Sequence, residues 1–255
     1  MFENKSIIIG VSGGIAAYKT AYLVSALSKT EADVNVIMTE NACEFISPLV
    51  FETLTGNKCY VDTFDRNFKF DVEHISLAKK ADIFMIAPAT ANVIAKIANG
   101  IADDMLTTTF LASKCKKIVS PAMNTAMFEN QITQDNIAKL KKYGIGVVEP
   151  QNGLLACGDT GAGKMPEPDF LFDVIEREIA REKDMLGKKV LVTAGATMES
   201  LDPVRFLTNH SSGKMGFAIA KEAMLRGAEV TVVKANTTAE IPNFVKIVEV
   251  SSAKD

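Results

Sequence analysis

The chain of 255 residues has no tryptophan, two histidines and four cysteines, and these scarcities limit the kinds of site it can hold. Cys43, Cys59, Cys115 and Cys157 show no pairing with metal-ligand spacing, and two histidines add few ligands, so we expect no metal site. A reducing, cytoplasmic compartment is the simplest interpretation of cysteines used in this way.

An excess of one charge and a long apolar run are lacking as well. The formal net charge of −3 gives no electrostatic footprint for nucleic acid or for a membrane surface. The most apolar segment, residues 83–98, is interrupted by Pro88, Asn92 and Lys96, and we expect no secretory leader before the first apolar stretch. With 47% apolar and 23% charged residues, the composition predicts a soluble globular protein with no nucleic-acid or membrane partner.

The most informative stretch that is present covers residues 7–27 and reads IIIGVSGGIAAYKTAYLVSAL. An apolar strand runs into Gly10 and then Ser12, Gly13 and Gly14, and an Ala- and Leu-rich helix follows at once. Small residues at the start of a helix let an anion approach backbone N–H groups, and the Ser12 hydroxyl can add a donor. We therefore favour a phosphate site over a tight turn that uses glycine only for packing, but the spacing matches no generic nucleotide motif and leaves the ligand open.

Short apolar segments alternate with helical patterns through the first part of the chain, which predicts an α/β fold with a doubly wound parallel sheet. The expected strands are residues 7–9, 34–38, 58–61, 83–87, 118–120 and 146–149. Clusters of small or polar residues follow several of these strands. Because such sheets bind ligands beyond the carboxyl ends of their strands, the clusters predict one shared site.

The alternation stops at residue 151. Residues 151–168 contain four glycines and two prolines without periodicity, which predicts a long functional loop. A helix over 169–181 and a charged linker follow, and a new strand and glycine turn begin at Lys189. We therefore predict a first domain over 1–186 and a second over 187–255. The second has three expected strands and one clear helix, too few for an independent doubly wound sheet, so we expect it to be incomplete.

Four motifs in order, and a fifth beyond them, carry a family resemblance. They are GVSGGIAAYK, APATAN with the NGIADD that follows it, PAMNTAM, ACGDTGAGKMPEP and, past residue 187, VTAGATMESLDPVRFLTNHSSGKMG. Together they resemble the flavin-dependent cysteine decarboxylase family. Its bifunctional members join a phosphopantothenoylcysteine decarboxylase to a phosphopantothenate–cysteine ligase of coenzyme A biosynthesis. The resemblance implies two Rossmann-like domains, a flavoprotein domain and the opening of the cytidine-nucleotide-dependent ligase.

The resemblance implies that FMN is the cofactor of the first domain and a small molecule its substrate. The implied flavin-binding residues follow the strand ends: Gly10, Ser12, Gly13, Thr39, Ala87, Pro88, Ala89, Thr90, Ala122 and Met123. The implied substrate-binding residues are Met127, Ala156, Gly158 and Lys164. From the sequence alone, Thr39 is as readily a cap at the end of a strand.

Three residues carry the implied catalysis. His74 resembles the family's base, because imidazole exchanges protons near neutral pH, although a histidine beside a helix start is often only a cap or a surface residue. Asn124 matches the Asn of PAMN and can donate to a substrate carboxylate, or it can cap the next helix. Cys157 lies in the glycine-rich segment and is implied to serve the reducing half of the cycle, whereas the other cysteines are expected to be inert.

The implied reaction is the FMN-dependent decarboxylation of N-(4′-phosphopantothenoyl)cysteine to 4′-phosphopantetheine. Flavin oxidises the thiol carbon to a thioaldehyde, loss of CO₂ gives an ene-thiol, and the flavin then returns the electrons. Cys157 favours this complete reaction over flavin prenyl transfer. His74, Asn124 and Cys157 together favour it over a non-catalytic flavoprotein that regulates a partner.

In the second domain the resemblance implies that Asn209 takes part in the turnover of an acyl-cytidylate. Gly195, Ser211, Ser212 and Gly213 could again bind phosphate. CTP and Mg²⁺ belong to the complete ligase only, and we expect no ligase turnover from this chain. Members of the family assemble as trimers or multiples of trimers, so the resemblance implies a homotrimer or a multiple of it.

Overall fold

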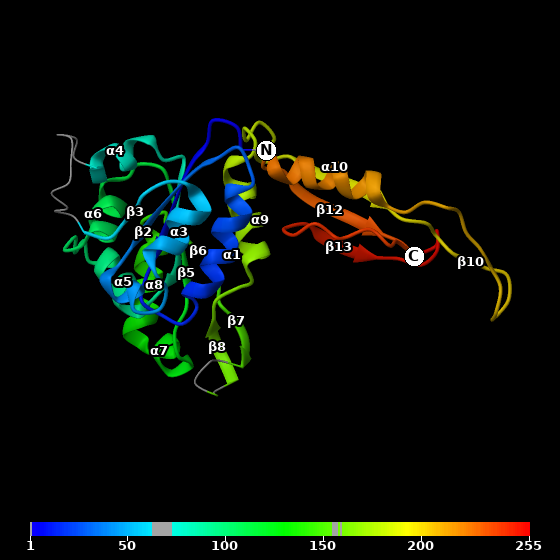
Figure 1. Ribbon diagram of the computed structural model, residues 1–255. Coiled ribbons are helices and arrows are strands. Elements are labelled where there is room, and N and C mark those ends of the chain that lie inside the picture. Colours follow the sequence, from blue (N-terminus) through cyan, green and yellow to red (C-terminus); the bar gives the residue numbers. More distant parts are fainter. Residues whose placement is uncertain (1, 63–72, 155–157, 159) are drawn as a thin grey trace. The chain divides into compact units, whose positions relative to one another are not determined.

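The computed structural model describes residues 2–62, 73–154, 158 and 160–255 (Figure 1). Their contacts divide the chain into two units, Met1–Ile175 and Glu176–Asp255, and the division falls inside helix α9 (Pro168–Ile179). The domain boundary at residue 186 stays a prediction.

The first unit is built on a six-stranded sheet in which every pair of neighbouring strands is parallel. In spatial order the strands are β3 (Cys59–Tyr60), β2 (Asp33–Met38), β1 (Ser6–Val11), β4 (Ile83–Ala89), β5 (Lys116–Pro121) and β6 (Gly146–Val147). The predicted doubly wound α/β fold is thus confirmed. The chain reverses its direction across the sheet between β1 and β4, and this order opens a crevice at their carboxyl ends.

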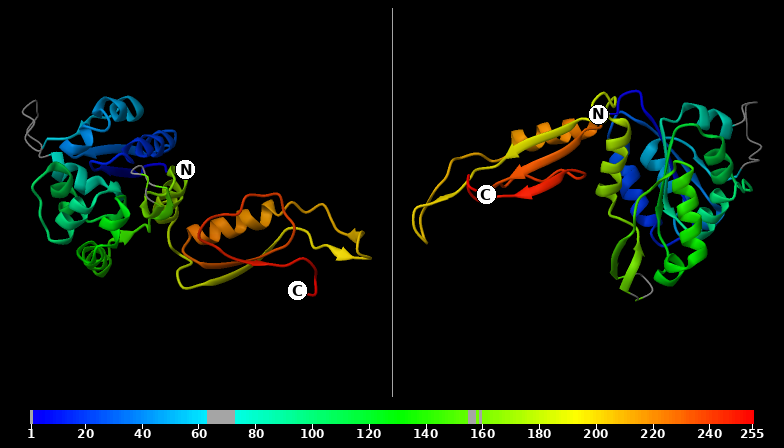
Figure 2. Two further views of the ribbon diagram at one scale, coloured as in Figure 1. Left: turned by 90° about the horizontal axis from the view of Figure 1, so that it is seen from below. Right: turned by 180° about the vertical axis from the view of Figure 1, so that it is seen from behind.

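The strands form because their residues are apolar on both faces. Ile7, Ile8 and Ile9 are fully buried, as are Ile83 and Phe84 on the neighbouring strand. Helices α1 (Ala17–Ser28), α3 (Pro48–Thr55) and α9 lie together on one face in Figures 1 and 2. The other face holds a core shared by α4 (Glu73–Lys80), α5 (Ala91–Ala98), α6 (Met105–Ala112) and α8 (Gln131–Lys142). Burial on both faces explains why the strands read as unbroken apolar runs.

Local capping signals set several helix ends. Ser47 accepts a hydrogen bond from the Leu49 N–H, Pro48 is the first helical residue, and Gly56 ends α3 with φ of 71°, as the sequence predicts. Asp104 caps α6 with a reciprocal bond pair to Thr107. The short helix α2 (Glu40–Cys43) was not expected, and α4 includes His74, which the sequence places beside a helix start.

The predicted loop over residues 151–168 is wrong in part. The structure has an antiparallel hairpin there, formed by β7 (Gln151–Leu154) and β8 (Thr160–Lys164). Glycines in β8 make the segment look irregular in sequence, but they serve close packing against α7 (Thr125–Glu129) and against the residues just before it. A Cβ on Gly161 would lie 2.7 Å from Thr125 Oγ1, and one on Gly163 would lie 2.3 Å from the Met123 carbonyl oxygen.

The second unit has a parallel three-stranded sheet of β13 (Lys246–Glu249), β12 (Glu229–Lys234) and β9 (Lys189–Ala194). Helix α10 (Lys214–Leu225) packs on it through a small core of its own. The two-residue strands β10 (Glu199–Ser200) and β11 (Phe206–Leu207) form a separate antiparallel pair that was not predicted.

Candidate functional site

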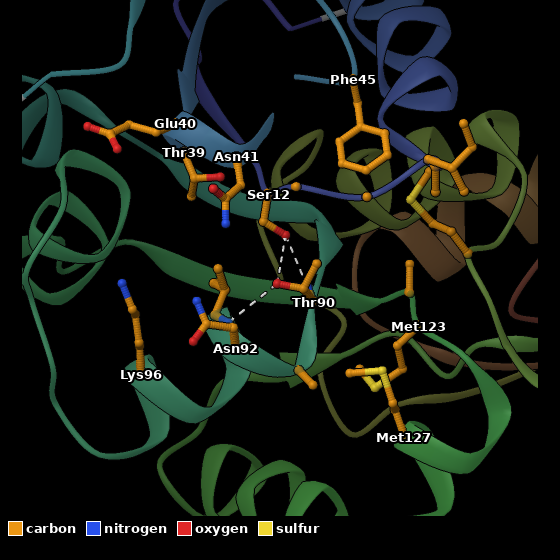
Figure 3. Close-up of a pocket in the computed structure, with 18 of the residues that line it drawn as sticks. Ser12, Thr39, Glu40, Asn41, Phe45, Thr90, Asn92, Lys96, Met123 and Met127 are labelled. Atoms are coloured by element: carbon orange, nitrogen blue, oxygen red, sulfur yellow. Dashed lines mark hydrogen bonds between the residues drawn. The ribbon is translucent and has the colours of Figure 1, made fainter. Parts of the chain in front are cut away.

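A cavity of about 990 Å³ opens at the carboxyl ends of the strands in the first unit. Its walls come from the segments that follow β1, β2, β4 and β5 and from the β7–β8 hairpin. Figure 3 shows Ser12 and Thr90 beside each other in this space, with Asn41 near them and Met123 and Met127 on another wall. The cavity therefore lies where the reversal of strand order predicts a ligand.

The turn between β1 and α1 presents a row of backbone donors to the cavity. Helix α1 begins at Ala17, a few residues later than expected, and residues 13–16 form a turn that lines the cavity. Among the hydrogen bonds of the described residues, none uses the backbone N–H groups of Gly13, Gly14, Ile15 or Ala16. Donors left over at the start of a helix, near its positive dipole end, form an anion site.

Ser12 and Thr90 tie the ends of β1 and β4 together. The buried Ser12 hydroxyl donates to the Pro88 carbonyl oxygen at 2.7 Å, and the Thr90 N–H donates to Ser12 Oγ at 3.0 Å. Thr90 Oγ1 also lies 3.3 Å from Ser12 Oγ (Figure 3). The Ser12 hydroxyl therefore donates its proton to the Pro88 carbonyl oxygen, within the protein. It holds the end of β1 to the end of β4 and has no second proton to donate to a ligand.

Gly13 is forced by close packing. A Cβ at this position would lie 2.6 Å from Asn41 Cβ and 2.9 Å from the Asn41 carbonyl carbon, closer than real Cβ atoms come. A Cβ on Gly14 would meet nothing nearer than Thr90 Cγ2 at 3.8 Å. Asn41 follows Thr39, whose hydroxyl accepts from the Ala42 N–H and so caps α2. The capping role considered for Thr39 is present, and the residue also lines the cavity.

Asn124 and Met127 line the cavity beside the end of β5, together with Ala122 and Met123. Asn124 Oδ1 accepts from the Ala126 N–H at 2.8 Å, so the alternative of a helix cap is realised for the oxygen of the amide. The Nδ2 group is a separate donor and is not used by that cap. Half of the Met127 surface is exposed. The hairpin closes this side, because the Met123 N–H donates to the Gly163 carbonyl oxygen at 3.1 Å.

A charged cluster forms another part of the wall. Lys96 Nζ lies 2.6 Å from Asp103 Oδ1 and 3.1 Å from Asp104 Oδ2, and the hydrogen bond to Asp103 is the main reason that the pKa of Lys96 is raised. Burial alone would raise the pKa of Asp104, but hydrogen bonds from Thr107 and Lys96 outweigh it and lower the pKa. Lys96 and Asp104 are therefore both held in their charged forms at neutral pH.

Several predicted site residues lie elsewhere. Gly10, Ala87, Pro88 and Ala89 are buried within β1 and β4 and do not line the cavity. A Cβ on Gly10 would lie 2.5 Å from Leu106 Cδ1, so this glycine serves strand-to-helix packing.

The segment predicted to carry catalysis is only partly described. His74 belongs to α4 rather than to a loop, and its side chain is not among those described. Ala156 and Cys157 lie outside the described residues, in the connection between β7 and β8. Gly158 has φ of 89° in that connection, a conformation that favours glycine. Lys164, at the end of β8, lines the cavity.

Sequence reasoning missed other lining residues. Asn41 and Phe45 follow β2, Lys19 lies on α1, and Leu154 and Met165 come from the hairpin and the segment after it. The polar segment 39–41 that follows β2 could have indicated Asn41. Nothing local indicates Lys19, since a lysine on a helix usually faces solvent.

The remaining cysteines show no sign of reactivity. Burial, with a smaller effect of Glu52, raises the pKa of Cys59 to about 12, and burial also raises the pKa of Cys43 and of Cys115. Among the residues that the structure describes, no group of three or more His, Cys, Asp and Glu side chains could hold a metal ion. No helix in the described part is long and apolar enough to cross a membrane.

The second unit has a glycine turn of its own. Gly195 and Gly213 both have positive φ, and a Cβ on Gly213 would lie 3.2 Å from the Gly195 N. Asn209 Oδ1 accepts from the Ser211 N–H at 2.9 Å, and the Ser212 carbonyl oxygen accepts from Thr237 Oγ1 at 2.6 Å. Gly195, Ser212 and Gly213 thus lie together in the turns beside the ends of β9 and β12.

Comparison with known proteins matches two parts of the sequence to two families. Residues 1–180 match the family described as Flavoprotein, and residues 185–255 match the DNA/pantothenate metabolism flavoprotein C-terminal domain. The coenzyme A biosynthesis bifunctional protein CoaBC of Bacillus subtilis is 44% identical over 258 residues, which cover 100% of this chain and 64% of that protein. CoaBC of Vibrio vulnificus is 45% identical, over 99% of this chain and 63% of its own length. The chain therefore spans less than two thirds of these relatives.

Solved structures resemble the first unit. A PPC decarboxylase mutant complexed with pantothenoylaminoethenethiol has a TM-score of 0.60 and 29% identity, over 67% of this chain and 96% of that one. The FMN-dependent cysteine decarboxylase SpaF has a TM-score of 0.57 and 31% identity, over 64% of this chain and 92% of that one. These likenesses and the family match over residues 1–180 confirm the resemblance seen in the motifs: the chain belongs to the flavoprotein family.

Proposed function

We propose that the chain catalyses the FMN-dependent decarboxylation of N-(4′-phosphopantothenoyl)cysteine to 4′-phosphopantetheine, a step of coenzyme A biosynthesis. The observation that carries the proposal is the row of unused N–H donors at residues 13–16, which faces a large cavity at the reversal of strand order. The names of the relatives support the reaction, since they include CoaBC proteins and a PPC decarboxylase.

The residues present fit FMN. Residues 13–16 would hold its phosphate through backbone N–H groups, and the missing side chain of Gly13 leaves the turn in the shape that this requires. A single row of donors suits one phosphate group, which favours FMN over FAD. Thr39, Thr90, Ala122 and Met123 line the rest of the space and would contact the remainder of the cofactor.

When bound, the flavin supplies oxidation of the substrate thiol carbon and later returns the electrons. Asn124 would orient the substrate carboxylate, because a neutral amide binds a carboxylate without the strong ion pair that opposes loss of CO₂. Met127 and Lys164 line the same space and would contact the substrate. His74 would accept the substrate proton, and Cys157 would donate one during reduction of the ene-thiol.

The second unit would contribute to the ligation of phosphopantothenate and cysteine in proteins of the CoaBC type. Its residues Gly195, Asn209 and Gly213 would then contact the cytidine nucleotide, with CTP and Mg²⁺ as requirements of the complete ligase.

We also propose a homotrimer, in which copies meet through the first unit. Its α1 carries exposed Tyr18 and Tyr22 on one side, a surface suited to such a contact.

The test is a single anaerobic turnover by the full chain loaded with FMN. Phosphopantothenoylcysteine is added, and the products are separated and weighed by mass spectrometry. We expect CO₂ and 4′-phosphopantetheine, and we expect the released cofactor to be FMN. The proposal is contradicted if a fluorescence titration shows no binding of FMN. It is also contradicted if the protein binds FMN and the substrate is recovered unchanged.

A further inference from the structure

Lys19 is a buried cation in the cavity wall, one helical turn beyond the N–H row of residues 13–16. Only 10% of its side chain is exposed. Its Nζ donates to Glu167 Oε1 at 2.7 Å and to the Met165 carbonyl oxygen at 3.3 Å. A buried ammonium group is costly in free energy unless it is paired and hydrogen-bonded. The two contacts therefore hold Lys19 and the segment of Met165 and Glu167 together.

The partners of Lys19 belong to the segment that directly follows the β7–β8 hairpin. Lys164, the last residue of β8, also approaches Glu167 Oε1, at 3.7 Å. The Lys164 side chain lies over the other strand, since a Cβ on Gly153 would be 3.4 Å from its Cδ. The contacts thus run from α1 through Glu167 to both strands of the hairpin.

The opposite side of the hairpin is held by backbone contact with the end of β5. The Met123 N–H donates to the Gly163 carbonyl oxygen, and Gly161 packs on Thr125. The hairpin is therefore held at the end of β5, and Lys19 joins the segment directly after it to α1.

The charge of Lys19 is already matched. The hydrogen bond from Lys19 is the main reason that the pKa of Glu167 is lowered, so the carboxylate is charged at neutral pH. A matched pair offers a second anion little attraction, which favours an attachment over a binding site for substrate phosphate.

We propose that Lys19 is a positioning residue that holds the β7–β8 hairpin against the cavity beside the turn of residues 13–16. The inference rests on the proposed function for its effect on turnover. Lys19→Met keeps the length of the apolar stem but removes the ion pair. In this variant we expect the hairpin to separate more often from the end of β5. The hairpin side of the cavity would then be out of position when substrate is bound.

The first measurement is amide hydrogen exchange of Met123, whose N–H bonds to the hairpin. In Lys19→Met we expect exchange faster by about tenfold or more, the factor that corresponds to loss of a hydrogen bond to a charged group. We expect kcat to fall by a similar factor, while the KM of substrate and the Kd of FMN change less than about threefold, because Lys19 positions a wall and does not hold either ligand. Lys5→Met, which removes the partly exposed pair of Lys5 with Asp82, is the matched control and should change none of these values.

A second variant guards against a fold that fails. Glu167 is 53% exposed, and Glu167→Gln keeps its shape, so this variant should fold and should also speed the exchange of Met123. The double variant should exchange no faster than the quicker of the two single variants, because both remove the same contact. Unchanged exchange at Met123, or additive effects in the double variant, overturns the inference. Unchanged exchange with a large rise in KM or in the Kd of FMN also overturns it, in favour of direct anion binding. Exchange needs no turnover, so an inactive wild type would refute the proposed function and leave the positioning role to be decided by Met123.

Discussion

Gly13→Ala should weaken FMN binding through a steric effect that the structure allows us to size. The added methyl group would lie 2.6 Å from Asn41 Cβ and 2.9 Å from the carbonyl carbon and oxygen of the same residue. Two of these atoms belong to the backbone, so no rotation of a side chain relieves the contact. The turn of residues 13–16 must move instead, and with it the N–H row that would bind phosphate.

Overpacking of this kind costs about 1–3 kcal/mol, and each 1.4 kcal/mol is a factor of ten in an equilibrium constant. If binding FMN restores the turn, that cost appears in the dissociation constant, which should rise roughly 5- to 150-fold. The assay is a titration that follows quenching of flavin fluorescence, with chemical denaturation of the protein free of FMN to show that the variant is folded.

The matched control is Gly14→Ala. Its methyl group would lie 3.8 Å from Thr90 Cγ2, an ordinary contact, so it should weaken FMN binding much less than Gly13→Ala. Binding by Gly13→Ala with the affinity of the wild type would refute the reasoning. Equal losses in the two variants would show that the ligand, and not Asn41, meets the new methyl group.

Three further predictions concern other parts of the first unit. Asp104→Ala should lower the free energy of unfolding by about 1–2 kcal/mol at pH 7, since it removes the α6 cap and a partner of Lys96. Because folding lowers the pKa of Asp104, its contribution to stability is complete above the ordinary pKa of 3.8 and is lost as the pH falls through the pKa of the folded state. Urea titrations should therefore show a smaller difference between the variant and the wild type at pH 3 than at pH 7. His74→Asn should bind FMN but fail to reduce it with substrate, and stopped-flow bleaching at the wild-type rate would remove His74 from the mechanism. Cys157→Ser should release CO₂ and stop at an ene-thiol that lacks two hydrogen atoms, and saturated product at near wild-type yield in one anaerobic turnover would mean that Cys157 has another role.

The local sequence determined the strands of the main sheet and the ends of some helices. Unbroken β-branched and apolar runs specified strands buried on both faces, such as Ile7–Ile9, because only a covered parallel sheet tolerates them. Ser47, Pro48 and Gly56 fixed both ends of α3, since caps act within one turn of the chain. The order of the sequence motifs predicted the flavoprotein family, and the family match over residues 1–180 confirmed it.

Contacts between distant residues were decided by the tertiary structure alone. The meaning of Gly13 depends on Asn41 in the next strand-to-helix turn, and the glycines of β8 depend on α7, so the sequence of 151–168 looked like a loop when it forms a hairpin. Ser12 hydrogen-bonds to Pro88, 76 positions away in the sequence, and Lys19 to Glu167, 148 positions away. A local pattern reports the chain's own conformation, whereas a packing glycine or a buried charge is explained only by the atoms that folding brings beside it.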